Sequence, residues 1–213
     1  AASDVYKRQQ LHRLNYYLPQ GASHFIPPPA PLPALRFCGA GTASFRKGTD
    51  LFIEVARIVH QLHPQVTFTW MGGFESEALQ QQYLQLVQQY QLEQVVTFAG
   101  PLQPEAMKTA YGAYDALLLT SREDPYPLVV LEAAFCGRPA VVFESAGGIA
   151  EFVEEVGVLV KEPTAGAMAA ALLQQPTDAW VELGASARTK ALQLHADVTL
   201  LTQQLRPLVA IAD

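Results

Sequence analysis

The chain has 213 residues, half of them hydrophobic and only 16% charged, which excludes intrinsic disorder over most of its length. Its 14 Lys and Arg residues against 20 Asp and Glu residues give a net charge of −6, so any phosphate binding must be local rather than that of a general polyanion binder. No apolar run approaches the ~20 residues of a membrane-spanning helix, and the N-terminus lacks the apolar region of a signal peptide.

The start of the chain is set aside from the fold. Residues 4–9 look like the translated end of a transposon sequencing adapter, an interpretation that we favour over an ordinary amphipathic N-terminus. Residues 1–9 are therefore treated as an artefact, and we expect that the natural gene continued upstream. Residues 10–34 are interpreted as a remnant and a linker, because five prolines crowd residues 27–33 and favour an extended polyproline conformation. A stiff surface loop is the alternative, but the position ahead of the first strand favours an interdomain linker.

From residue 35 onward, short apolar strands alternate with helices. Strands are predicted at residues 35–38, 66–71, 95–98, 116–119, 140–143 and 158–160, and the helices include residues 50–62, about 75–90 and a segment from about 104. On the helix at 50–62, the buried stripe is predicted to be Leu51, Val55, Ile58 and Leu62. This alternation predicts an α/β fold with a doubly wound, mostly parallel, six-stranded Rossmann-like sheet at residues 35–176, followed by a helical tail at 177–213.

A loop with two adjacent cations, Arg46 and Lys47, is predicted between the first strand and the first helix. The loop begins like a dinucleotide fingerprint, but Ser44 replaces the third glycine of that motif. Backbone amides at a helix N-terminus, together with basic side chains, suit a phosphate or diphosphate. A solvated basic pair with Gly48 in a turn fits these residues equally well, so the loop alone leaves both interpretations open.

Two acids, Asp124 and Glu132, lie eight residues apart in the predicted loop and helix after the fourth strand. Pro127 suits the first position of that helix, and Leu128 and Val129 would then offer free amides to an anion. Glu132 lies in an otherwise apolar helix, where a carboxylate is costly unless it is hydrogen-bonded, and sugar hydroxyls are natural partners. We favour two acids that flank one ligand over a helix-capping acid with a glutamate tilted to the surface.

Several motifs occur in an order that is typical of one family. They are Arg46-Lys47-Gly48 with Asp50-Leu51-Phe52, residues 121–129 leading to Leu131-Glu132-Ala133, Gly137-Arg138-Pro139, and Gly147-Gly148 with Glu151. Over about residues 35–162 the chain resembles the C-terminal, donor-binding half of a retaining glycosyltransferase of family 4, which has the GT-B architecture. The resemblance implies that an N-terminal domain is missing and that this fragment alone is inactive.

The resemblance implies roles for the basic loop and the helix N-terminus. The family lysine that grips the donor diphosphate corresponds to Lys47. The place of an arginine found in many members is Thr42 here, and Arg46 is the candidate substitute for it. The backbone amides of Leu128 and Val129 correspond to further diphosphate donors.

The resemblance also implies roles for the two acids. Asp124 corresponds to the acid that contacts the donor sugar and is the candidate catalytic residue, although neighbouring Glu123 leaves this assignment open by one position. Glu132 corresponds to the acid that holds the nucleotide ribose, and Gly147 and Gly148 are expected near the donor through their backbone.

The implied function is the retaining transfer of a hexose-type unit from a nucleotide-diphosphate sugar to an acceptor. A nucleotide-sugar epimerase or a phosphorylase of the same architecture, or a non-catalytic nucleotide-sugar-binding module, are the alternatives. No metal and no cofactor besides the donor are expected. The expected partners are the nucleotide sugar and the missing N-terminal domain, through which any membrane contact would be made; no nucleic acid is expected. Widely spaced Cys38 and Cys136 favour reduced thiols and a cytoplasmic protein.

Overall fold

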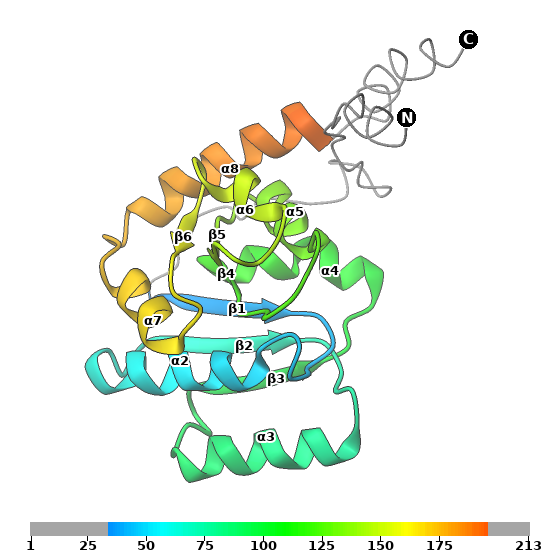
Figure 1. The fold of residues 1–213 in the computed structure, drawn as a ribbon, viewed down its shortest axis with the longest axis vertical. Helices are drawn as coiled ribbons and strands as arrows, with labels where there is room; N and C mark the ends of the chain where they lie inside the picture. The colour runs from blue at the N-terminus through cyan, green and yellow to red at the C-terminus, as the bar shows by residue number, and fades with distance from the viewer. Residues whose placement is uncertain (1–33, 196–213) are drawn as a thin grey trace, which may run out of the picture.

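The computed structural model describes residues 34–195, except for the side chains of residues 104, 105 and 108. Within these residues, six strands form one parallel sheet in the order β3-β2-β1-β4-β5-β6 (Figure 1). The strands are β1 (Arg36–Ala40), β2 (Thr67–Met71), β3 (Val96–Gly100), β4 (Ala116–Leu119), β5 (Ala140–Phe143) and β6 (Val158–Val160). This is the strand order of a doubly wound Rossmann sheet, and the predicted fold class is confirmed.

Helices cover both faces of the sheet. They are α2 (Thr49–Leu62), α3 (Glu77–Gln89), α4 (Pro104–Ala110), the 3-10 helix η2 (Tyr111–Ala113), α5 (Leu128–Phe135), α6 (Ile149–Val153), α7 (Ala165–Leu173) and α8 (Ala179–His195). On one side of the sheet α2 packs against α3 and α7, and on the other α5 packs against η2 and α8 (Figure 1). Because neither face is left to solvent, every residue of the central strands β4 and β5 is apolar and buried.

The predicted stripe of α2 was correct in part: Val55 is buried, and Leu51 and Ile58 are half-buried against the core, but Leu62 is exposed. The structure buries Phe52, Ile53, Val55, Ala56 and Val59, and only Val55 belongs to the predicted set. Leu62 is 65% exposed. Helix α2 packs beside α7, which itself contacts β5 and β6, so the side of α2 that faces α7 is buried together with the side that faces the sheet.

Part of the predicted tail is an integral element of the domain. Helix α8 packs along α5, and Trp180 near its start is buried with its ring edge-on to Phe37 of β1, at a centroid distance of 5.5 Å. The adapter-like start, nearly all of the proline-rich segment and residues 196–213 lie outside the described residues. Within residues 34–195, no helix has the length and apolar character needed to cross a membrane.

Candidate donor-binding site

Two loops meet where the strand order reverses, between the neighbouring strands β1 and β4. In a doubly wound sheet, this switch point at the carboxyl ends of the strands is where ligands bind. The backbone amide of Arg122, in the β4–α5 loop, donates to the carbonyl of Arg46, in the β1–α2 loop, at 2.9 Å. The Thr120 hydroxyl donates to the carbonyl of Lys47 at 3.1 Å. The two loops that carry the predicted site residues are therefore hydrogen-bonded to each other.

Gly48 makes this close approach possible. Its φ of +66° lies in the left-handed region, and a Cβ atom at this position would lie 1.9 Å from the carbonyl oxygen of Thr120. Helix α2 begins at the next residue, Thr49. The turn expected at Gly48 is present, and it fixes Lys47 beside the end of β4.

Lys47 and Asp124 form an ion pair across the two loops. Their side chains are only 15% and 10% exposed, so water screens the pair less than it would on an open surface. The residues are 77 positions apart in sequence, and each was predicted to contact the donor. The structure thus brings the predicted diphosphate lysine and the predicted sugar-binding acid into direct contact.

Arg122 joins the two loops through hydrogen bonds that could not be predicted from the sequence. Its guanidinium binds the Asp50 carboxylate through two hydrogen bonds of 2.7 and 2.6 Å and donates to the Phe45 carbonyl at 2.6 Å. It also lies 3.8 Å from the centroid of the Phe45 ring. Arg46 adds a bond in the opposite direction, to the carbonyl of Glu123 at 3.0 Å. An Asp at the start of a helix and an Arg after a distant strand give no local pattern that would indicate this contact.

Helix α5 begins directly after the loop that carries Asp124. Pro127 was predicted at the first helical position, but the structure makes it the N-cap, with ψ at 109°, and the helix begins at Leu128. That prediction was wrong by one residue because the extended backbone of Pro127 completes the loop before the helix starts. Leu128 and Val129 thus occupy the first two helical positions, where amides have no acceptor within the helix. Both remain suited to an anion.

Glu132 follows Leu128 by four residues and therefore lies on the same face of α5. The hydroxyl of buried Tyr111 donates to its Oε2 atom at 2.8 Å. Burial raises the pKa of the Glu132 carboxyl, whereas the bond from Tyr111 lowers it. The costly carboxylate in an apolar helix is thus satisfied partly by a tyrosine, a partner that the sequence did not indicate.

Gly147 and Gly148 pack against the acidic loop. Gly147 has a φ of +94°, and a Cβ atom there would lie 2.5 Å from the carbonyl oxygen of Asp124. The Gly148 amide donates to the carbonyl of Pro125 at 3.1 Å. The pair therefore lies beside the site as expected, with the Gly148 amide already engaged in holding the loop that carries Asp124.

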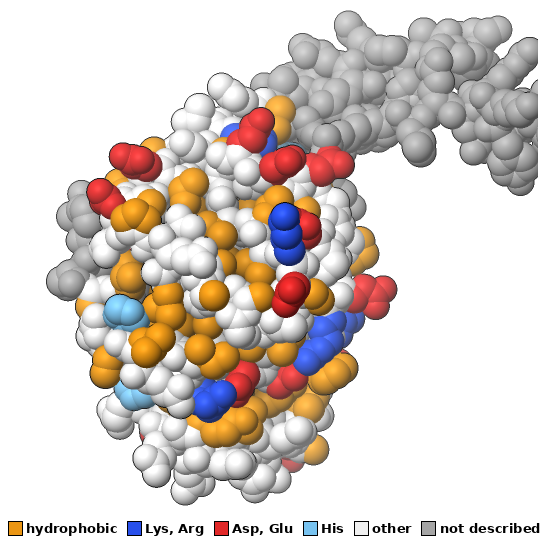
Figure 2. Space-filling model, turned by 60° about the vertical axis from the view of Figure 1, so that its left-hand side comes forward, with side chains coloured by type: hydrophobic (Ala, Val, Ile, Leu, Met, Phe, Trp, Pro, Cys, Tyr) orange, Lys and Arg blue, Asp and Glu red, His pale blue; other side chains and the backbone are white. Residues whose placement is uncertain are grey.

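Among the described residues, no cluster of three or more His, Cys, Asp or Glu side chains is placed to hold a metal ion. Cys38 and Cys136 are buried free thiols, and burial raises the pKa of the Cys136 thiol to about 12. On the face shown in Figure 2, the Lys and Arg side chains lie beside acidic ones, which fits local rather than extended binding of anions.

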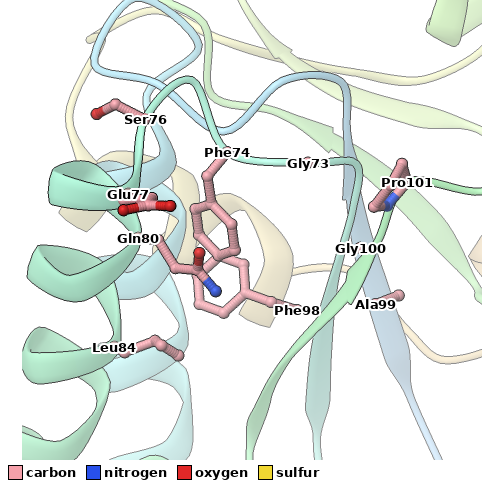
Figure 3. A pocket seen from close by; sticks show the side chains of 10 residues that line it. All are labelled: Gly73, Phe74, Ser76, Glu77, Gln80, Leu84, Phe98, Ala99, Gly100 and Pro101. Atoms are coloured by element: carbon pink, nitrogen blue, oxygen red, sulfur yellow. The ribbon is translucent and has the colours of Figure 1, made fainter.

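A separate cavity of about 640 Å³ lies between α3 and the end of β3 (Figure 3). The rings of Phe74 and Phe98 line it, with their centroids 4.9 Å apart, and Glu77 and Gln80 project from α3 at its side. None of the predicted site residues lines this cavity, and β3 is the edge strand, separated from β1 by β2. It is distinct from the crevice at the switch point.

Comparison with known proteins identifies a family and several relatives of this chain. The chain matches the family described as "Glycosyl transferases group 1" over residues 33–178. It is 34% identical over 106 residues to an alpha-galactosylglucosyldiacylglycerol synthase of Streptococcus pneumoniae, covering 49% of this chain and 27% of that protein. It is 30% identical over 165 residues to a D-inositol 3-phosphate glycosyltransferase of Gordonia bronchialis, covering 72% of this chain and 36% of that protein.

The fold is likewise shared with a solved structure. Anabaena Alr3699/HepE, crystallised with UDP-glucose, superposes with a TM-score of 0.71 and 25% identity, covering 84% of this chain and 49% of that one. The chain spans less than two thirds of each of these proteins. The resemblance to a glycosyltransferase domain of the GT-B architecture is confirmed. Since the family match extends over more than half of its residues, this chain belongs to the glycosyl transferases group 1.

Proposed function

We propose that this chain binds a nucleotide-diphosphate sugar as the donor domain of a retaining glycosyltransferase that transfers a hexose-type unit. The observation that carries this proposal is the contact between Lys47 and Asp124 at the switch point of the sheet. One crevice thereby presents a cation for the diphosphate and a carboxylate for sugar hydroxyls. HepE, which shares the fold, was crystallised with a donor of this chemical class, UDP-glucose.

The diphosphate of the donor is assigned to the basic loop and to the N-terminus of α5. Lys47, Arg46 and the amides of Leu128 and Val129 bind the diphosphate and stabilise the charge that grows on it as the sugar leaves. Arg46 can do so because its bond to the Glu123 carbonyl engages one nitrogen of a guanidinium that carries five donor hydrogens. We propose that these groups replace a metal ion as the counter-charge.

The remaining roles concern the sugar and the ribose. We propose that Asp124 is the catalytic residue that contacts the donor sugar and that Glu132 accepts hydrogen bonds from the ribose. Gly147 and Gly148 fix the position of Asp124 through their backbone contacts with the acidic loop. The acceptor would be held by a further domain of the same enzyme.

The direct test is calorimetry of the 213-residue chain with UDP, GDP and ADP and with their glucose conjugates. We expect at least one nucleoside diphosphate to bind, and its conjugate to bind with a different enthalpy because Asp124 engages the sugar. If none of these ligands binds, the proposed function is wrong.

Replacing Lys47 should weaken the diphosphate contact specifically. We expect Lys47→Ala to weaken nucleoside-diphosphate binding by about 1.5–3 kcal/mol, the scale of a hydrogen bond to a charged group, while binding of the free nucleoside changes little. The matched control is Arg57→Ala, which breaks the Arg57–Glu54 ion pair on α2 and should leave both affinities unchanged. Equal losses for nucleoside and diphosphate would remove Lys47 from this role.

The two acids should respond to different parts of the donor. We expect Glu132→Gln to weaken binding of every ligand that carries the ribose, whereas Asp124→Asn should spare the nucleotide and weaken only the sugar nucleotide. Calorimetry of UDP and UDP-glucose with each variant separates the two roles. The control is Glu123→Gln at the neighbouring exposed position. If Glu123→Gln gives the effect expected of Asp124→Asn, the sugar-binding acid is assigned one position too late.

A further inference from the structure

Tyr111 is buried beneath the proposed site. It begins the 3-10 helix η2, which precedes β4 and packs against α5, and its side chain has no exposed surface. Its hydroxyl donates to Glu132 Oε2 at 2.8 Å. A buried hydroxyl without an acceptor is costly, so this bond ties the orientation of the Glu132 carboxylate to the fixed position of the tyrosine ring.

Few other ionisable groups lie around this pair. Cys136 lies one turn further along α5, and Cys38 lies on β1; both act electrostatically on Tyr111. Arg138 follows α5, and Arg188 lies on α8, which packs along it; both act electrostatically on Cys136. The shift in the pKa of Glu132 is due to burial, which raises it, and to the bond from Tyr111, which lowers it. Burial also raises the pKa of the Tyr111 phenol well above its ordinary value, so the phenol keeps its proton.

We propose that Tyr111 is the positioning residue for nucleotide recognition: by holding Oε2 of Glu132 it leaves Oε1 as the acceptor for the ribose hydroxyls. This inference rests on the proposed function and extends it to a residue that never touches the donor. The bond from Tyr111 engages Oε2 of Glu132 and does not involve Oε1. A carboxylate fixed at one oxygen presents the other in a single orientation, so less rotational freedom is lost when the ribose binds.

The sign of the pH dependence follows from the same bond. The ionised carboxylate accepts at both oxygens, whereas protonation removes its charge and turns one oxygen into a donor. Nucleotide affinity should therefore be full above the pKa of Glu132 and fall as pH drops through it. Burial moves this fall to a higher pH than an ordinary glutamate would give. Removal of the Tyr111 hydroxyl takes away a bond that lowers the pKa and should move the fall to a still higher pH.

The test is calorimetry of UDP, GDP and ADP with the unaltered chain and with Tyr111→Phe, from about pH 8 to about pH 4.5. We expect Tyr111→Phe to bind the nucleotide roughly tenfold more weakly, to lose affinity at a higher pH than the unaltered chain, and to bind inorganic diphosphate equally well. In a Glu132→Gln background, where the pH-dependent acceptor is absent, Tyr111→Phe should cause no shift of the pH profile. Because phenylalanine retains the ring, the variant should fold, and its melting temperature checks this.

The experiment distinguishes failure of the Tyr111 inference from failure of the proposed function. If the unaltered chain binds a nucleotide and Tyr111→Phe binds it with an unchanged pH profile, Tyr111 only fills space and the inference is overturned while the proposed function stands. A lower melting temperature with an unchanged profile has the same meaning. If the unaltered chain binds none of the three nucleotides, the proposed function fails and this inference fails with it.

Discussion

Gly48→Ala is expected to destabilise the chain by about 4–5 kcal/mol, a large part of the stability of a typical domain. The alanine would be held in the left-handed region, and its Cβ atom would lie 1.9 Å from the backbone oxygen of Thr120. Backbone on both sides must therefore move apart, which breaks the hydrogen bonds that join the two loops. Urea denaturation followed by the fluorescence of the buried tryptophans Trp70 and Trp180 measures the loss.

Two other glycines separate the effect of the left-handed backbone from that of the close contact with Thr120. Gly100 has a φ of +73°, but a Cβ atom added there would meet no other atom within 4 Å, so Gly100→Ala should cost only the backbone term of about 1–2 kcal/mol. Gly166 lies in α7 with open space around it and no positive φ, so Gly166→Ala should stabilise the chain by up to ~1 kcal/mol. If Gly48→Ala costs no more than Gly100→Ala, the two loops are not held together by this close approach.

The second large effect concerns activity: we expect the 213-residue chain to bind donor and to transfer no sugar. The described residues form one sheet, and the chain covers 27% and 36% of two relatives. The proposed function assigns the acceptor to a further domain of the enzyme. Holding two reactants together contributes about 7–11 kcal/mol to lowering a reaction barrier, and without that domain this contribution is absent.

Mass spectrometry tests this second expectation. The chain is incubated with labelled sugar nucleotides and a mixture of acceptors, and products are followed beside a parallel calorimetric measurement of donor binding. The Asp124→Asn variant is the control for a contaminating enzyme. Sustained turnover that disappears in this variant would mean that the chain itself positions an acceptor, and the assignment of that task to another domain would be wrong.

Much of the fold could be predicted because the strands carry a simple signal. The apolar runs at 116–119, 140–143 and 158–160 coincide with β4, β5 and β6. In β4 and β5 every residue is buried, so no polar residue obscures the ends of the strand. The strands nearer the other edge of the sheet differ by one or two residues, with β1 running from Arg36 to Ala40 rather than over 35–38. The full set of buried residues on α2 could not be predicted, because α2 packs against α7, which lies more than a hundred residues later in the chain.

The positions of two candidate site residues could be predicted from the neighbouring elements alone. Lys47 precedes a helix and Asp124 follows a strand, so each could be placed at the switch point from local sequence alone. The contacts that join them could not be found in this way. Arg122 and Asp50 are 72 residues apart, and Tyr111 and Glu132 belong to different elements. Such pairs are set by tertiary packing, which a single sequence does not display.

The Lys47–Asp124 ion pair has a consequence for how fast a donor can arrive. In the crevice the ammonium and the carboxylate cancel each other's field, and the chain as a whole carries a charge of −6. An approaching dianion therefore experiences no long-range attraction, and capture depends on dipoles and hydrogen bonds that act only at contact. The association rate should accordingly be moderate and should rise somewhat with ionic strength, because salt screens the repulsion between the dianion and the negative chain. Discrimination among ligands should then lie mainly in their dissociation rates.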